Sequence, residues 1–140
     1  MHNPQERFAC LIPKPTSFFL SEGNFVLSPN TIIVVQAENS ETAFISYILS
    51  KSLGEVSGYE IAVMAHGNNQ ERGNIHLSLD TDDSLGEEGY ELSVTTDSVR
   101  LNANSPAGLF YGVQTLRQLL PVHSSDAVSL PALSIRDIPR

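Results

Sequence analysis

Residues 89–121 carry the sequence GYELSVTTDSVRLNANSPAGLFYGVQTLRQLLP, and this stretch decides the fold. Apolar and polar side chains alternate over residues 90–95 and again over residues 98–103. Because successive side chains of a strand point to opposite faces of a sheet, each segment has one apolar face and one polar face. A short polar link at Thr96 and Asp97 joins the two segments. The alternation predicts a β-hairpin with one buried face and one face in water.

A helix is predicted to follow this hairpin directly. The Ser105 hydroxyl can accept from a free backbone N–H at the helix start, and Pro106 suits the first helical position. Pro121 ends the helix because it cannot donate the next backbone hydrogen bond. Phe110 lies beside an apolar stripe at helical spacing, made of Leu109, Val113, Leu116 and Leu120.

Two glycines, Gly108 and Gly112, lie four residues apart and therefore on one face of the predicted helix. A glycine inside a helix costs roughly 1 kcal/mol relative to alanine, so a compensating contact is expected. The same spacing occurs in membrane helix dimers, but no run of this chain is apolar enough to span a bilayer. The glycines therefore predict a helix packed tightly on a sheet.

Upstream of the hairpin, the sequence predicts two short strands at residues 16–20 and 25–27, separated by turn residues 21–24. Residues 31–36, with the sequence TIIVVQ, are β-branched and almost fully apolar, which is typical of a central strand buried on both faces.

A first helix is predicted to begin at Asn39 or Ser40 and to run to about Leu53, where Gly54 ends it. Its apolar stripe comprises Phe44, Ile45, Ile48, Leu49 and Leu53. Further strands are predicted at residues 59–64, 74–79 and 128–135, the last placed at a sheet edge because Pro131 lacks an N–H.

Each predicted helix has one apolar stripe and needs one sheet face to cover it. We therefore expect the α+β class: a two-layer sandwich with a mixed, mainly antiparallel β-sheet and both helices packed on one face. Residues 31–36 place apolar side chains on both faces of the predicted strand, so a loop or a partner is expected to cover part of the second sheet face.

Composition narrows the range of functions. The chain has 140 residues, which suits one domain, and a net charge of -8 with only eight Lys and Arg. The electrostatic footprint of a nucleic-acid-binding protein is therefore absent, and an anionic membrane surface would repel the chain. Cys10 is the single cysteine, so no disulfide can form within the chain. The first residues lack a signal-peptide pattern, which indicates a cytoplasmic protein or one whose signal was removed.

Candidate catalytic chemistry is sparse. The densest acidic cluster does not fit a calcium loop, because the position that requires glycine is Leu85. The histidines show no zinc-ligand spacing, and there is no nucleophile elbow, dinucleotide fingerprint or phosphate-binding loop. We therefore assign no catalytic, cofactor-binding or metal-binding residue, and we expect no cofactor. The residues considered as calcium ligands are Asp80, Asp82, Asp83, Glu87 and Glu88, and those considered as zinc ligands are His2, His66, His76 and His123.

The order of three segments resembles the non-catalytic N-terminal domain of glycoside hydrolase family 20 enzymes, the exo-acting β-N-acetylhexosaminidases. These segments are IPKP at 12–15, GYEL at 89–92 and AGLFYGVQTLRQLL at 107–120. The last is the specific one. The closing residues 135–140, IRDIPR, resemble the segment that leads into the first strand of a TIM barrel in that family.

The resemblance implies a two-part enzyme in which the barrel carries an adjacent Asp-Glu pair and the substrate's own 2-acetamido group is the nucleophile. This chain contains no Asp-Glu dipeptide, so neither catalytic residue can be placed in it. The expected organisation is a lead-in at residues 1–12, an accessory domain at 13–135 and a linker at 136–140. The expected partner is a barrel of the same polypeptide, with neither nucleic acid nor membrane involved.

Two other functions remain open at this point. The same kind of accessory domain precedes the barrels of α-glucuronidases and of O-GlcNAc-hydrolase-like enzymes. A free-standing module that binds sugars or proteins is the second alternative, although Trp is absent from the chain. On every one of these hypotheses, the isolated chain is expected to be catalytically inactive.

Overall fold

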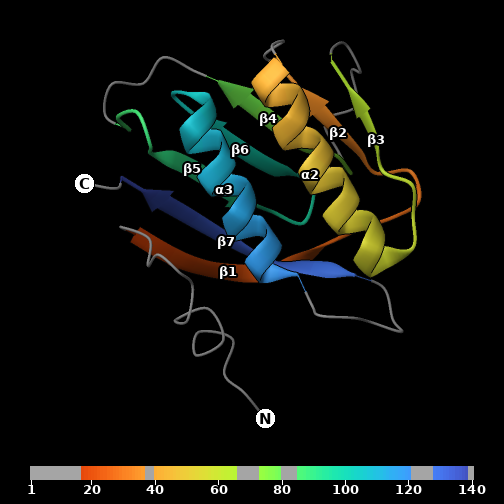
Figure 1. Ribbon diagram of the computed structural model, residues 1–140. Coiled ribbons are helices and arrows are strands. Elements are labelled where there is room, and N and C mark those ends of the chain that lie inside the picture. The colour runs from red at the N-terminus through yellow and green to blue at the C-terminus, as the bar shows by residue number, and fades with distance from the viewer. Residues whose placement is uncertain (1–16, 37–39, 66–72, 80–84, 121–127, 139–140) are drawn as a thin grey trace.

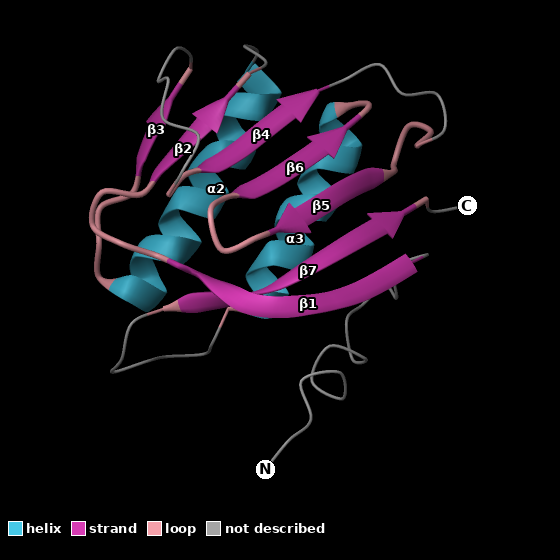
Figure 2. Ribbon diagram, turned by 180° about the vertical axis from the view of Figure 1, so that it is seen from behind, coloured by secondary structure: helices cyan, strands magenta, loops and turns pink. Residues whose placement is uncertain are grey.

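The computed structural model describes residues 17–36, 40–65, 73–79, 85–120 and 128–138, which form seven strands and two helices. Both helices lie side by side on one face of a single sheet (Figure 1), and the view from behind shows the other face without helices (Figure 2). The elements are β1 Ser17–Val26, β2 Ile32–Val35, α2 Ser40–Ser57, β3 Ala62–Met64, β4 Ile75–Leu79, β5 Tyr90–Val94, β6 Val99–Ala103, α3 Pro106–Leu119 and β7 Ser129–Asp137.

The strands follow the order β1-β7-β5-β6-β4-β2-β3. Pairings from β1 to β6 are antiparallel, and pairings from β6 to β3 are parallel. The predicted α+β sandwich with a mixed sheet is confirmed. Three of the strand pairings described are antiparallel and three are parallel. Helix α2 carries the chain from β2 across one sheet face to β3, which is the kind of crossover that this parallel pair requires.

The predicted hairpin is confirmed as β5 and β6, with Leu92 opposite Leu101 in the antiparallel register. Their alternate apolar side chains are buried beneath α3, while Glu91 and Arg100 project from the other face. Residues 33–35 of β2 are all buried, so this strand is covered on both faces as its sequence predicts.

The start of α3 is also as predicted. Ser105 has extended backbone angles and its hydroxyl accepts from the N–H of Gly108, 3.4 Å away. The same hydroxyl donates to the carbonyl of Glu87, which ties the helix start to the segment that enters β5. The cap thus fixes the helix both to its own first turn and to the hairpin.

The two glycines of α3 allow the helix to touch the hairpin directly. A Cβ atom on Gly108 would collide with the carbonyl oxygen of Gly89, and one on Gly112 would overlap the Leu101 side chain, 2.9 Å from its Cδ2. Both glycines are buried. The prediction of close approach is confirmed.

A buried polar contact also joins α3 to the hairpin. The hydroxyls of Tyr90 on β5 and Thr115 on α3 are 2.5 Å apart, and both residues are almost fully buried. Removal from water raises the pKa of the Tyr90 phenol above its ordinary value of 10.0, the hydrogen bond between Tyr90 and Thr115 lowers this pKa, and the nearby Asp137 raises it.

The first strand differs from its prediction. The turn expected at residues 21–24 is instead an irregularity within one continuous strand, β1, whose register against β7 shifts between Leu20 and Asn24. Gly23 supplies the backbone conformation, with a φ of 97°. The turn-forming residues make a β-bulge here because β1 pairs with β7 both before and after them.

The end of the first helix was also predicted wrongly. Helix α2 continues through Gly54 to Ser57, and Gly58 ends it with a φ of 80° and an N–H donated to the Gly54 carbonyl. Gly54 lies close to another backbone segment, since a Cβ there would be 3.0 Å from the Tyr59 carbonyl oxygen. Glycine at 54 serves close packing, and glycine at 58 serves the helix end.

Pro131 does not mark an edge strand, because β7 lies between β1 and β5. The pairing with β5 runs only from Asp137 to Leu133, so the portion around Pro131 pairs with β1 alone. The proline is therefore tolerated in an interior strand at a place where the strand has a single neighbour. The strand predicted at residues 59–64 is shorter, and residues 1–12, 80–84 and 121–127 lie outside the described part of the chain.

We predict that Gly112→Val destabilises the domain by about 1–3 kcal/mol or more, because the added methyl groups overpack the contact with Leu101. Urea unfolding monitored by circular dichroism measures this change. Ala107→Val, an exposed position on the same helix, is the matched control and should change stability by less than about 0.5 kcal/mol. An unchanged unfolding midpoint for Gly112→Val would refute the close-packing account.

We predict that the stabilisation from Tyr90 is present below about pH 10 and declines as the pH rises through its raised folded-state pKa. The unfolded chain then releases a phenol proton that the folded chain retains. Tyr90→Phe should cost about 1 kcal/mol near neutral pH, and this cost should shrink at alkaline pH. Urea unfolding at neutral and at alkaline pH measures this cost, with the exposed Tyr111→Phe as control. A cost that stays constant with pH would contradict this assignment.

Candidate functional site

The structure describes three of the residues considered as metal ligands or catalytic groups, His76, Glu87 and Glu88. His76 lies buried in β4, and Glu87 and Glu88 are exposed in the turn before β5. Among the described residues, no group of three or more His, Cys, Asp or Glu side chains could hold a metal ion. His2, His66, His123, Asp80, Asp82, Asp83 and Cys10 lie outside the described ranges.

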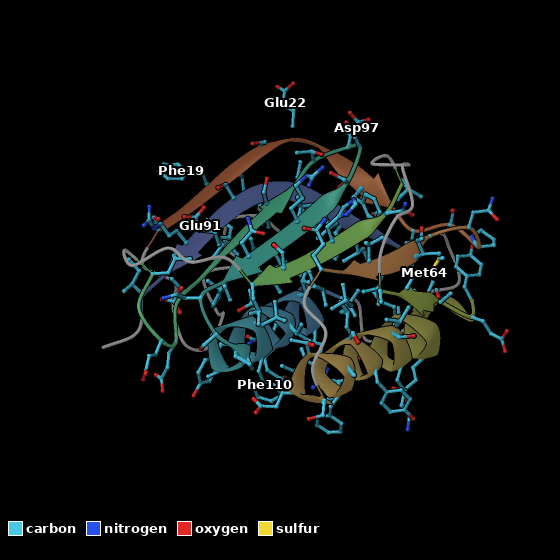
Figure 3. The ribbon with its side chains drawn as sticks, turned by 90° about the horizontal axis from the view of Figure 1, so that it is seen from above. Phe19, Glu22, Met64, Glu91, Asp97 and Phe110 are labelled. Atoms are coloured by element: carbon cyan, nitrogen blue, oxygen red, sulfur yellow. The ribbon has the colours of Figure 1, made fainter. Side chains whose placement is uncertain are left out.

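The most unusual surface is the outer face of the helix layer. An amphipathic helix on a sheet normally turns polar side chains outward. Here Phe44 and Tyr47 of α2 are 61% and 58% exposed, and Tyr111 of α3 is 38% exposed. Phe110, beside Tyr111, points away from the sheet on the helix side (Figure 3). Three exposed aromatic rings thus lie on the helix layer, and Phe110 beside them is partly buried against the core.

A groove of about 420 Å³ runs between the N-terminal halves of the two helices. The rings of Phe110 and Tyr111 form one wall and meet nearly edge-to-face, with centroids 6.2 Å apart. Among the described residues of the lining, Glu41 is the single carboxylate. The lining comprises Ser40, Glu41, Phe44, Ile45, Pro106, Ala107, Phe110 and Tyr111, which we call the helix groove.

The helix groove offers mainly apolar and aromatic contacts. General acid–base hydrolysis of a glycosidic bond ordinarily requires two carboxyl groups, and the described residues of the lining include one. Aromatic rings concentrated in a shallow apolar depression are instead typical of the centre of a protein interface.

Sequence reasoning placed Phe44 in the buried stripe of α2, and the structure contradicts this. Phe44 and Ile45 are neighbours, about 100° apart around a helix, so only one of them can face the sheet squarely. Ile45 is buried and Phe44 is exposed. The signal that could have located the surface is the width of the apolar stripe, which exceeds what one sheet contact can cover.

The last described residues lie close to the start of α3. Asp137, the last residue of β7, pairs with Tyr90 at the start of β5. The adjacent Gly89 lies against both the Asp137 carbonyl and Gly108 in the first turns of α3. The C-terminal end of β7 and the helix groove are therefore at the same end of the domain.

The described residues form an α+β sandwich with both helices on one sheet face and a groove between them. Comparison with known proteins gives the family. Residues 9–138 match the model of glycosyl hydrolase family 20, domain 2. This chain belongs to that family, as the motifs at residues 12–15, 89–92 and 107–120 indicate.

Similar proteins are bacterial hexosaminidases. A β-N-acetylhexosaminidase of Cellulomonas fimi is 32% identical over 93% of this chain, and a β-hexosaminidase of Porphyromonas gingivalis is 35% identical over 92%. The solved N-acetyl-β-hexosaminidase of Streptomyces plicatus superposes over 99% of the chain with a TM-score of 0.82 and 32% identity.

The chain spans only part of these relatives: 26% and 17% of the two curated proteins and 27% of the solved one. Domain 2 of this family is normally joined to a catalytic barrel in the same polypeptide. Within the described residues, neither helix combines the length and the apolar character that a membrane crossing requires.

Proposed function

We propose that this chain is the accessory domain of an exo-acting β-N-acetylhexosaminidase and that its helix groove packs against the catalytic barrel of the same polypeptide. The observation that carries the proposal is the coincidence of family membership with an exposed aromatic face on the helix layer. A catalytic domain covering Phe44, Phe110 and Tyr111 would bury apolar surface at about 25 cal/mol per Å².

The position of the chain end supports this arrangement. Because β7 ends beside the first turns of α3, a polypeptide continuing from Asp137 needs only a short linker to reach the helix groove. A short linker gives a high effective concentration of the partner, so even a modest groove suffices for stable docking. The two helices then form the middle layer between the sheet and the barrel.

The reaction that we propose for the whole enzyme is removal of terminal N-acetylglucosamine or N-acetylgalactosamine by retaining, substrate-assisted hydrolysis. Family 20 enzymes are an exception to the two-carboxylate retaining mechanism, because the substrate's acetamido oxygen attacks the anomeric carbon. The names of the relatives support this class of substrate. In this scheme the accessory domain supports the barrel, and the reacting groups belong to the barrel.

We predict that the purified 140-residue chain does not hydrolyse a chromogenic N-acetyl-β-glucosaminide. A spectrophotometric assay over hours measures this, with an intact hexosaminidase as the positive control. Turnover by the chain that disappears on a point mutation within it would overturn the assignment of the chemistry to a barrel.

We predict that replacing Phe44 and Tyr111 together by serine affects the isolated chain and the barrel-linked protein differently. In the 140-residue chain Phe44 is 61% exposed and Tyr111 is 38% exposed, so the unfolding free energy should change by only about 1 kcal/mol. In a protein that carries the barrel, the same change should lower the melting temperature by several degrees, because truncated interface anchors cost about 1–4 kcal/mol.

The matched control for this experiment is Phe19→Ser, an equally exposed aromatic on the opposite face of the sheet. It should leave the melting temperature of the barrel-linked protein unchanged. Equal effects of the helix-face and sheet-face variants would contradict docking through the helix groove.

A further inference from the structure

The sheet face opposite the helices carries a second hollow, of about 320 Å³. Its centre lies over β7 and β5, where Ser134 and Ser93 are directly opposite each other. The same cross-strand row continues to Phe19 on β1 and to Arg100 on β6. Because serine is much smaller than either flanking residue, the row forms a floor of two hydroxyls between an aromatic wall and a cationic wall.

A second cross-strand row closes one side of this hollow. Arg136 of β7, Glu91 of β5 and Asn102 of β6 are consecutive partners in it. The guanidinium of Arg136 lies 3.7 Å from Glu91 Oε1, and both side chains are about 40% exposed. The Ser78 hydroxyl donates to Asn102 Oδ1, which fixes the amide and turns its N–H₂ group toward other acceptors.

The hollow is therefore amphipathic in a particular way. Phe19, 67% exposed, offers an apolar ring face, and it projects with Glu91 on the side of the sheet away from the helices (Figure 3). The floor and far wall offer donors from Arg100 and Asn102, acceptors from Glu91, and serine hydroxyls that can do both. Three strand spacings, about 14 Å in total, separate the backbones of Phe19 and Arg100.

Among the described residues, the lining of the hollow carries charges of both signs, from Arg100, Arg136 and Glu91. Arg136 lies beside Glu91, and the acidic Glu22 and Asp97 lie on the same side of the sheet (Figure 3). An anionic ligand would meet these carboxylates in a chain of net charge -8. A pyranose ring has one face of C–H groups and a rim of hydroxyls that both donate and accept, so it matches the aromatic wall and the mixed polar floor together.

We propose that this sheet face, made of Ser17, Phe19, Glu91, Ser93, Arg100, Asn102, Ser134 and Arg136, is a binding site for a pyranose unit of a neutral β-linked glycan. Phe19 stacks on the ring, and the polar groups bond its hydroxyls. The choice of glycan rests on the proposed function, since the whole enzyme would act on such chains. The site faces away from the helix groove and would hold a polymeric substrate near the enzyme.

The test is a ¹H–¹⁵N NMR titration of the 140-residue chain with N,N′-diacetylchitobiose as the probe. We expect fast-exchange shifts at millimolar sugar, confined to residues on β1, β7, β5 and β6 around Ser93 and Ser134. Phe19→Ala and Arg100→Ala should each weaken binding by roughly fivefold to tenfold, the loss expected for one aromatic or charge-assisted contact. Phe44→Ala, on the helix face, is the control and should bind as the unmodified chain does.

Three outcomes would overturn the proposal: no shifts at millimolar disaccharide, shifts confined to the helix face, or tighter binding of an acidic disaccharide such as sialyl-galactose. Binding of cellobiose as well as chitobiose would support the glycan site without selectivity for acetamido sugars. The titration involves no hydrolysis, so its failure leaves the proposed function intact, and inactivity of a barrel-linked protein would leave the sugar site intact. Circular dichroism of each variant confirms that its fold is retained.

Discussion

The contact between α3 and the β5–β6 hairpin holds the domain together. Gly108 and Gly112 bring the helix backbone against Gly89 and Leu101, at a distance that any side chain would prevent. This proximity places Thr115 within hydrogen-bonding distance of Tyr90 in the buried interior, where an unpaired hydroxyl would cost about 1–3 kcal/mol. Helix α3 thereby lies directly on β5 and β6, and α2 packs beside it on the same sheet face.

The sequence predicted the elements whose signals are local. The alternation of the hairpin, the Ser105 cap and the helical stripe of α3 are each set by neighbours within a few residues, and all three are confirmed. The bulge at Gly23 and the interior position of Pro131 depend on what β7 pairs with, and strand neighbours far apart in sequence leave no local signal. Phe44 was predicted wrongly for a related reason. An apolar stripe shows which side chains favour a cover, but it does not show which surface covers each of them.

The family and the two candidate surfaces were predictable from the sequence to different degrees. Family membership could be predicted from the motif in α3, because tight helix packing demands a specific sequence there. The helix groove and the sheet-face hollow draw their residues from four helix turns and four strands, so that only the folded chain assembles them. The domain thus has an apolar face on its helices and a polar face on its sheet, which suits contacts with two chemically different partners.

The pairing of β1 with β7 joins the first described strand to the last. During synthesis the ribosome releases β1 long before β7 exists, so the edge of β1 stays unpaired until nearly the whole domain has emerged. Pairings between segments so distant in sequence also form slowly, because loop closure must precede them. The sheet can therefore close only after β7 has emerged, because β7 pairs with both β5 and β1.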